Sequence, residues 1–363
     1  MKIRKIEALR GFVALYVVVY HYMGNRGLAE LPSIIKFPFR FGQEGVIIFF
    51  LISGFVIYLS CYKSAHLSFA KYFLKRAVRI YPILIIAFIL SILVALSSHH
   101  SLTVNDYKSL AGNFFMLQDS DLKPGVIVLP FLRNYPLWSL SYEWWFYMMF
   151  YPIFLYLVKR ANKKLLANYL VLGISVAGWF LYLYHPNHLF LVLAYFSMWW
   201  TGVICAQTYV QYKTFTLKNT IHAIIPLLVM TILMAIPVIS LHHAGGQILI
   251  NSFPAITFRH YSFALLVILV GLGWWQIKVV GFNTIFGWFE RLSSISYALY
   301  IIHFIFIWAN FPFFPNPLAQ IGIKLVLIFI ISYLLEMKFQ PVINKLLLGK
   351  KKITPGMDVP ILN

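Results

Sequence analysis

The chain contains ten long apolar runs, and each run is apolar at consecutive positions rather than at alternate ones. A helix that crosses the hydrocarbon core needs about 20 apolar residues, whereas the strands of a membrane barrel alternate in hydrophobicity. We therefore predict an all-α polytopic integral membrane protein with about ten transmembrane helices. The predicted spans are residues 6–23, 45–61, 82–98, 137–158, 165–184, 189–207, 221–241, 261–276, 294–311 and 318–338.

The composition agrees with this class and excludes an ordinary soluble domain. Of the 363 residues, 61% are hydrophobic and 11% are charged, and the mean hydropathy is +0.79. The net charge of +20 would be typical of a nucleic-acid-binding protein, but such proteins gather their basic residues on one face of a soluble domain. Here the basic residues lie in short gaps between apolar runs. We therefore predict a lipid bilayer, and no nucleic acid, as partner.

The distribution of the basic residues predicts the orientation of the chain. Most of the 30 Lys and Arg residues fall in the N-terminus, in alternate loops and in the C-terminal tail, and basic residues collect on the cytoplasmic side of a membrane. Both termini are thus predicted to be cytoplasmic, in a multi-pass protein of the cell inner membrane. We expect a membrane domain over residues 1–340 and a basic tail, which contacts anionic headgroups, over residues 341–363.

The longest polar segment, residues 99–136, is predicted to lie on the outer side. It contains Asp106, Asp119 and Asp121, and also Pro124, Gly125 and Pro130. A connection of this length is uncommon as a simple turn. We expect it to cap the outer mouth of the helix bundle.

Two ionisable residues stand in the first apolar run, Arg10 near its start and His21 deep inside it. Eleven residues of α-helix make three turns plus about 20°, so both side chains share one face, roughly 16 Å apart. Ionisable groups at such depth usually face a protein interior and mark function. The alternative is that Arg10 extends to the headgroups and that His21 is an ordinary core histidine.

A second basic cluster, Lys75, Arg76 and Arg79, precedes the third span. Positions three and four apart lie on one helix face, so the three cations form a patch that suits phosphate groups. An interfacial helix that touches lipid is the simpler alternative for this cluster taken alone. The presence of Arg10 at the same membrane face favours a phosphate site.

The fourth span opens with Trp138, Ser139 and Ser141 and carries Glu143. Glu143 is the only carboxylate predicted clearly within the interior of a span, since Glu336 is predicted at a helix end. An intramembrane carboxylate needs a partner or an altered pKa, and either suits a role in handling a proton or orienting a hydroxyl. The span enters from outside, so we expect Glu143 to reach the site from the side opposite the arginines. The tryptophans fit an interfacial aromatic belt equally well.

A polar stripe marks the ninth span, where Ser296, Tyr300 and His303 are spaced for one helix face. His303 is predicted at a depth similar to that of His21, either as its partner or as a contact between helices. The other histidines fall mostly in outer loops without cysteines or intramembrane carboxylates beside them. No bound metal is therefore expected.

These features together resemble the membrane acyltransferase-3 family, which includes bacterial O-acetyltransferases of surface glycans. The similarity covers essentially the whole chain, although Lys75 stands where relatives commonly have an arginine. The matching residues, in the order of the family, are Leu9-Arg10-Gly11 with His21, Gly42 and Gly45 with residues 49–55, Lys75-Arg76 with residues 79–82, residues 138–143, and Ser296-Tyr297 with Tyr300 and His303.

The resemblance implies transfer of an acyl group, acetyl in the simplest case, from cytoplasmic acyl-CoA to a hydroxyl of a sugar or glycoconjugate acceptor. His21 would act as general base or as a transient acyl carrier. The expected roles are catalysis by His21 and Glu143, acetyl-CoA binding by Arg10, Arg76, Arg79 and Lys75, and acceptor binding by Trp138, Ser139, Ser141, Tyr300 and His303.

A proton-coupled transporter or flippase of an anionic lipid-linked sugar is the rival class. In it His21, Glu143 and His303 would relay protons, and the arginines would hold the headgroup. Transporters built from two homologous halves repeat their broken-helix pattern, and no such repeat stands in the sequence. A structural scaffold is a third alternative, but it leaves the polar residues of the spans unexplained.

Overall fold

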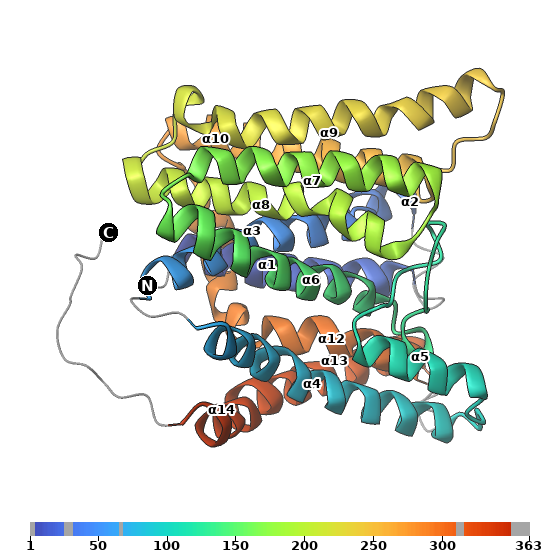
Figure 1. The fold of residues 1–363 in the computed structure, drawn as a ribbon. Coiled ribbons are helices and arrows are strands. Elements are labelled where there is room, and N and C mark those ends of the chain that lie inside the picture. Colours follow the sequence, from blue (N-terminus) through green and yellow to red (C-terminus); the bar gives the residue numbers. More distant parts are fainter. Residues whose placement is uncertain (1–3, 25–31, 65–67, 310–315, 350–363) are drawn as a thin grey trace.

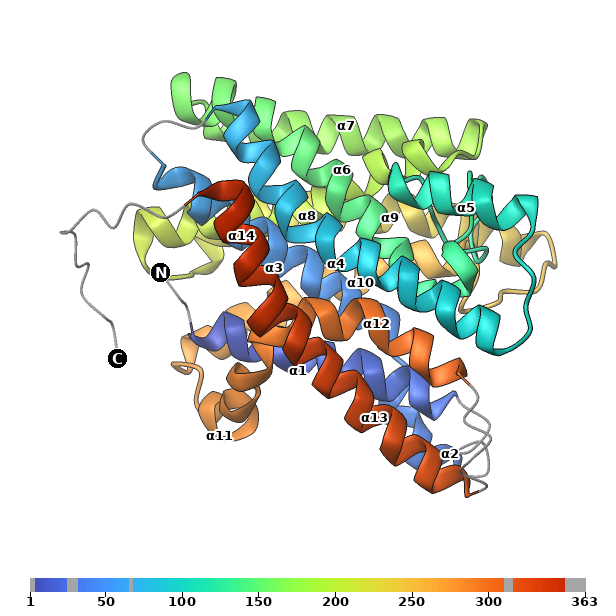
Figure 2. The ribbon, with the colours of Figure 1, turned by 90° about the horizontal axis from the view of Figure 1, so that it is seen from below.

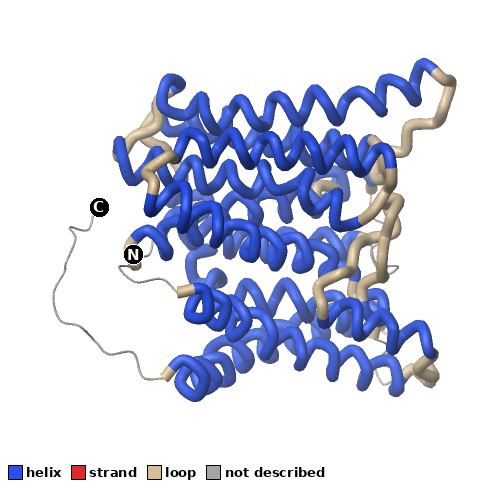
Figure 3. The backbone as a smooth tube through the Cα atoms, viewed as in Figure 1, coloured by secondary structure: helices blue, strands red, loops and turns tan. Residues whose placement is uncertain are grey.

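A computed structural model describes residues 4–24, 32–64, 68–309 and 316–349, and within these ranges the chain consists of helices and loops without strands (Figure 3). A helix lies at each of the ten predicted spans. Their bounds are α1 Arg4–Met23, α3 Gly42–Tyr62, α4 Phe69–Ser97, α6 Trp138–Ile153, α7 Lys164–Tyr184, α8 His188–Tyr212, α9 Leu217–His243, α10 Ala255–Gln276, α12 Ser296–Trp308 and α13 Pro317–Tyr333.

Eight helical segments of the described ranges are long and apolar enough to cross a membrane. Two helices fall short of that length: α6 continues as a π-helix, Phe154–Arg160, and α12 has 13 residues. The protein is therefore a multi-pass helical membrane protein, as predicted, whereas the number of ten spans stays a prediction. In Figure 1 the long helices run side by side, and the start of α1 and the end of α14 (Gln340–Leu348) lie at the same end of the bundle, opposite α5.

Two helices extend beyond the bounds of their predicted spans. The basic cluster forms the first turns of α4, which begins at Phe69 with the Ser68 side chain as its N-cap and runs without a break through Pro82. The last span likewise continues from α13 through a π-helix, Leu334–Phe339, into α14. In Figure 2 this long helix crosses the bundle beside α4 and α12. It thus includes the first part of the segment expected to be a tail.

Close helix crossings are made possible by glycines. A Cβ atom built on Gly54 of α3 would lie 2.2 Å from the carbonyl oxygen of Trp199, and one on Gly202 of α8 would lie 2.0 Å from that of Leu51. Small residues allow helix backbones to approach in this way. The α3–α8 crossing therefore places Ser53, next to Gly54, in a fixed position.

The outer segment, residues 99–136, folds partly as a helix. Helix α5, Val104–Phe114, begins with a capping box between Thr103 and Asp106, in which each residue satisfies an amide group of the other. The rest of the segment is irregular and reaches back into the bundle, where Asp119 and Lys123 are buried. It forms part of the wall of an outer cavity described below.

Candidate active site

A cavity of about 220 Å³ lies where three of the predicted cationic residues meet. Its wall includes Arg10 from α1, and Arg76 and Arg79 from α4. We call it the inner cavity, because Arg10 lies in the part of α1 near the end of the bundle predicted to be cytoplasmic. The other polar side chains in its wall are Ser53, Ser139, Glu143, Tyr147, Ser296, Tyr297 and Tyr300.

The Arg79 guanidinium is held by a carboxylate from a distant part of the chain. It donates to both oxygens of Glu336, at 2.5 and 3.0 Å, and Glu336 also accepts from the backbone N–H of Ala298 at 3.2 Å. Such a bidentate pair fixes the plane of the guanidinium. The prediction that Glu336 lies at a helix end is wrong, because the last helix continues beyond it to Leu348.

Arg10 and Arg76 are less fully neutralised. Arg10 lies 3.6 Å from Glu7, one turn earlier on α1. The Arg76 guanidinium packs 5.5 Å from the ring centre of Tyr72 and 5.7 Å from that of Tyr147. Its buried Nε has no hydrogen-bond partner among the described residues. The inner cavity thus offers positive charge to an anionic ligand.

Glu143 faces the inner cavity together with the arginines. Its Oε1 accepts hydrogen bonds from Ser53, at 2.8 Å, and from Tyr147, one turn further along α6. The expectation that Glu143 reaches the site from the side opposite the arginines is therefore wrong. The expectation placed Glu143 too close to the outer side of the membrane. Glu143 lies near the start of α6, but its carboxylate accepts from Ser53, which is in the middle of α3.

A second cavity, of about 390 Å³, adjoins the inner one and is called here the outer cavity. His21, Gln43 and Trp138 line it, and Val46 and Tyr300 line both cavities. The Tyr300 hydroxyl donates to the carbonyl oxygen of Pro136 at 2.9 Å and lies 2.7 Å from the Ser139 hydroxyl. Tyr300 is thereby held in place at the boundary between the two cavities.

His21 and His303 form a hydrogen-bonded pair. The Nδ1 atom of His303 lies 3.0 Å from the carbonyl oxygen of Leu299, which can only accept, so this nitrogen carries the proton of the neutral ring. The bare Nε2 of His303 therefore accepts from Nδ1 of His21, also at 3.0 Å. The carbonyl oxygen of Val17 lies 3.0 Å from the same His21 nitrogen. This arrangement leaves Nε2 of His21 as the basic nitrogen.

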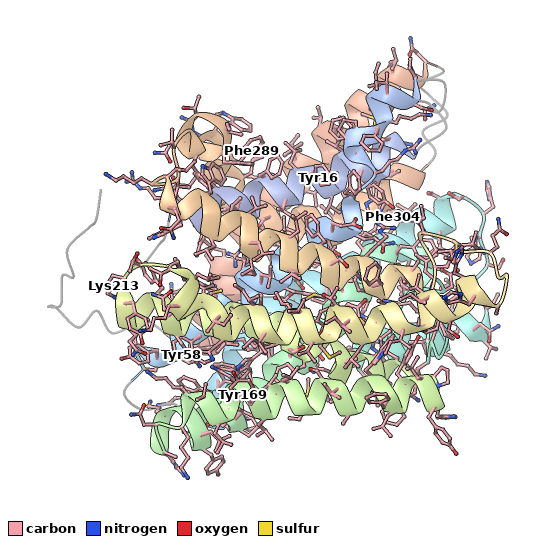
Figure 4. The ribbon with its side chains drawn as sticks, turned by 90° about the horizontal axis from the view of Figure 1, so that it is seen from above. Tyr16, Tyr58, Tyr169, Lys213, Phe289 and Phe304 are labelled. Carbon is pink, nitrogen blue, oxygen red and sulfur yellow. The ribbon has the colours of Figure 1, made fainter. Side chains whose placement is uncertain are left out.

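The two ends of α1 serve the two cavities. Figure 4 shows Phe289 near the first half of α1 and Phe304 near its other end, and the Phe304 ring centre is 5.0 Å from that of His21. One continuous helix thus carries Arg10 into the inner cavity and His21 into the outer one. This agrees with the predicted separation of roughly 16 Å along a single helix face.

Three of the residues expected in the site line neither cavity: Ser141, Lys75 and His303, of which His303 contacts His21 through their hydrogen bond. The hydroxyl of Ser141 is fully buried and donates to the carbonyl oxygens of Gln118, at 2.7 Å, and Trp138, at 2.8 Å. Lys75 is exposed on the surface of α4. The predicted roles of Ser141 and His303 in acceptor binding, and of Lys75 in donor binding, stay predictions. The two hydrogen bonds of Ser141 also hold the start of α6 in place.

A buried polar cluster that the sequence did not reveal supports the wall of the outer cavity. Asp119 pairs with Lys123 at 2.7 Å and with Nδ1 of His188 at 3.0 Å, and accepts from the Tyr142 hydroxyl at 2.6 Å. Burial alone would raise the pKa of Asp119, but Lys123 and His188 hold that pKa below its usual range. Burial lowers the pKa of Lys123, and Asp119 offsets part of this effect. The one signal in the sequence that could have indicated this cluster is the i, i+4 spacing of the opposite charges Asp119 and Lys123.

Comparison with known proteins defines the class of this enzyme. Residues 3–337 match the acyltransferase-3 family, described as an acyltransferase domain. This match covers most of the chain, so the protein belongs to the family and is an acyltransferase.

A curated relative, "Putative acetyltransferase ORF330" of Acidianus two-tailed virus, is 31% identical over 163 residues. The match spans 45% of this chain and 44% of the relative, less than half the length of either. No solved structure matches the chain.

Proposed function

We propose that the protein transfers an acyl group, acetyl in the simplest case, from cytoplasmic acyl-CoA to a hydroxyl of a sugar or glycoconjugate acceptor in the cell inner membrane. One observation carries this proposal. A single helix, α1, presents a cation in the inner cavity and a histidine with a bare nitrogen in the outer cavity, and Tyr300 and Val46 border both.

The inner cavity is the proposed donor site. Arg10, Arg76 and Arg79 would bind the phosphates of CoA at its mouth, since guanidinium groups pair well with phosphate oxygens. The pantetheine arm would then lead the thioester towards Tyr300. Glu143 was expected to be catalytic, but it lines this cavity and not the one with His21. Held by Ser53 and Tyr147, it would instead accept a hydrogen bond from a pantetheine amide on this path.

The outer cavity is the proposed place of reaction. Nε2 of His21 takes the proton of the acceptor hydroxyl as its oxygen attacks the thioester carbonyl carbon. The carbon–sulfur bond breaks, and the sulfur leaves as a thiolate that recovers the proton from His21. His303 accepts from Nδ1 of His21 and so keeps the reactive tautomer throughout, as the orienting residue does in a catalytic triad.

The test compares two variants of the purified protein with radiolabelled acetyl-CoA. We expect His21→Ala to abolish both transfer and hydrolysis of the label while CoA still binds, because His21 serves chemistry. We expect Arg76→Ala to weaken CoA binding by about ten-fold, the usual loss for one charge-assisted hydrogen bond, with turnover at saturation less affected.

The controls are wild-type protein and binding of CoA to each variant by calorimetry. Unchanged turnover in His21→Ala would refute the assigned base. Wild-type protein that binds no CoA and neither hydrolyses nor transfers the acetyl group would refute the donor assignment as a whole.

A further inference from the structure

A third and larger cavity, of about 910 Å³, adjoins His21 on its other side. We call it the wide cavity. Tyr20, His21 and Phe304 line both it and the outer cavity. The rest of its wall comes mainly from α10 and from the segment that leads into α3, with the aromatic side chains Phe37, Phe39, Phe41, Phe258 and Phe263.

A buried ion pair stands in the wall of the wide cavity. Glu44 of α3 is only 3% exposed, and its Oε1 accepts from both Nε, at 3.0 Å, and Nη2 of Arg259. The remaining nitrogen of Arg259 donates to the carbonyl oxygen of Ile250 at 2.8 Å and to the Asn251 side chain at 2.7 Å. Each of the three guanidinium nitrogens thus donates to the protein, while only one oxygen of the carboxylate is used.

Two polar atoms of this wall remain without a partner in the described parts of the chain. One is Oε2 of Glu44, and the other is Oγ of Ser262, three residues after Arg259 on α10. Leaving a buried polar atom unsatisfied costs about 1–3 kcal/mol, and more for a charged group. These two atoms are buried in residues that line one cavity beside the proposed base, so a small turn of each side chain would let a ligand in the cavity supply their hydrogen bonds.

We propose that Glu44 and Ser262 bind the hydroxyl groups of the acceptor sugar that flank the hydroxyl acylated at His21. The inference rests on the proposed function and narrows its acceptor to a polyhydroxylic one. A carboxylate oxygen accepts from a sugar hydroxyl, and the serine hydroxyl can accept or donate. The aromatic side chains of the same wall suit the apolar face of a sugar ring or an attached lipid. A simple long-chain alcohol would leave both polar atoms unsatisfied.

The experiment uses alkyl glycosides as acceptor probes with radiolabelled acetyl-CoA. The panel holds octyl β-glucoside, β-galactoside, α-mannoside and N-acetyl-β-glucosaminide, with the monodeoxy analogues of the best acceptor, and octanol for comparison. We expect wild-type protein to acylate at least one glycoside and to use a deoxy analogue at least ten-fold less well, since a site built for a hydroxyl rejects an analogue that lacks it.

Glu44→Gln and Ser262→Ala should each raise the KM for the glycoside by about ten-fold. Each variant should also lose the preference for the glycoside over the deoxy analogue that lacks the hydroxyl bound at that position. A merely structural role would not produce this effect. Ser262→Ala leaves no charge unpaired and keeps the test valid if Glu44→Gln folds poorly. Thr231→Val, which removes a hydroxyl bonded within α9, is the matched control.

Two results would overturn the inference. One is wild-type protein that hydrolyses acetyl-CoA but acylates none of the glycosides, or that acylates octanol equally well. The other is a pair of variants that keep the full preference against the deoxy analogue. Absence of acetyl-CoA hydrolysis as well as transfer in wild-type protein would instead refute the proposed function, so the two failures can be told apart.

Discussion

The hydrogen bond between His303 and His21 gives His21, the proposed base, a defined tautomer. Because Leu299 fixes the proton of His303 on Nδ1, the other ring nitrogen can accept only from His21. His21 would otherwise be able to exchange its proton between the two nitrogens, and one of those forms would present N–H rather than a lone pair to the acceptor. His303 is thus a positioning residue for the proposed base.

We predict that His303→Ala lowers kcat by about 10–100-fold, the usual loss when the group that orients an essential histidine is removed, with the KM for acetyl-CoA unchanged. His303→Gln should retain more activity than His303→Ala, because its amide oxygen can still accept from Nδ1 of His21. Steady-state kinetics of both variants provide the measurement. Equal loss in both variants, or a change confined to KM, would argue for a packing role only.

Single residues could be predicted from the sequence where an ionisable group interrupts an apolar run. Arg10 and His21 were found in this way, and their shared face follows from helix geometry alone. The partners of such groups could not be found, because they come from distant parts of the chain: Glu336 reaches Arg79, and Arg259 reaches Glu44. Glu143 was recognised as buried, but the cavity it faces depends on how α6 packs on α3.

At the scale of helices, the proposed donor site depends on the crossing of α3 and α8. Gly54 and Gly202 bring the two backbones close together, and Ser53, next to Gly54, donates to Glu143 of α6. A larger separation of α3 from α8 would push α3 towards α6 and disturb this hydrogen bond. The glycine contacts therefore determine the shape of the inner cavity as well as stability.

We predict that Gly202→Ala destabilises the protein by about 1–3 kcal/mol, the usual cost of overpacking, because its Cβ would lie 2.0 Å from the Leu51 carbonyl oxygen. The apparent affinity for acetyl-CoA should fall as well. Thermal unfolding in detergent and a CoA titration measure the two effects. Gly173→Ala on α7 is the control, since nothing lies within 4 Å of its Cβ, and an equal loss in both variants would contradict the crossing as the cause.

The positions of the helices were predicted well, and their ends less well. Ten apolar runs identify ten helices because burial in lipid demands continuous apolar sequence. Helix α4 begins before its apolar run, and the last helix continues after its own, since lysine and arginine favour helix as much as leucine does. The irregular path of residues 115–130 follows from the buried cluster at Asp119, whose partners Tyr142 and His188 come from distant parts of the chain.

At the scale of the whole molecule, the cavities are arranged along α1. The inner cavity lies with Arg10 in the first half of the helix, and the outer and wide cavities lie with His21 near its end. The start of α1 and the end of α14 are at one end of the bundle, and α5 is at the other (Figure 1). Donor and acceptor would therefore approach from opposite faces of the membrane and meet at Tyr300.

We predict that acetyl-CoA supports transfer only when supplied at the face that carries α14. Acetyl-CoA is charged and does not cross the bilayer, whereas an octyl glycoside reaches either face. Inverted vesicles, which expose the cytoplasmic face, should acylate the glycoside with external acetyl-CoA, and right-side-out vesicles should do so only after permeabilisation.

Cysteines introduced at Lys345 of α14 and Tyr107 of α5, in a variant lacking Cys61 and Cys205, report the orientation through an impermeant maleimide. The maleimide should label position 107 in right-side-out vesicles and position 345 in inverted ones. Transfer from acetyl-CoA supplied at the α5 face of intact vesicles would contradict the assignment of the arginine-lined cavity to the donor.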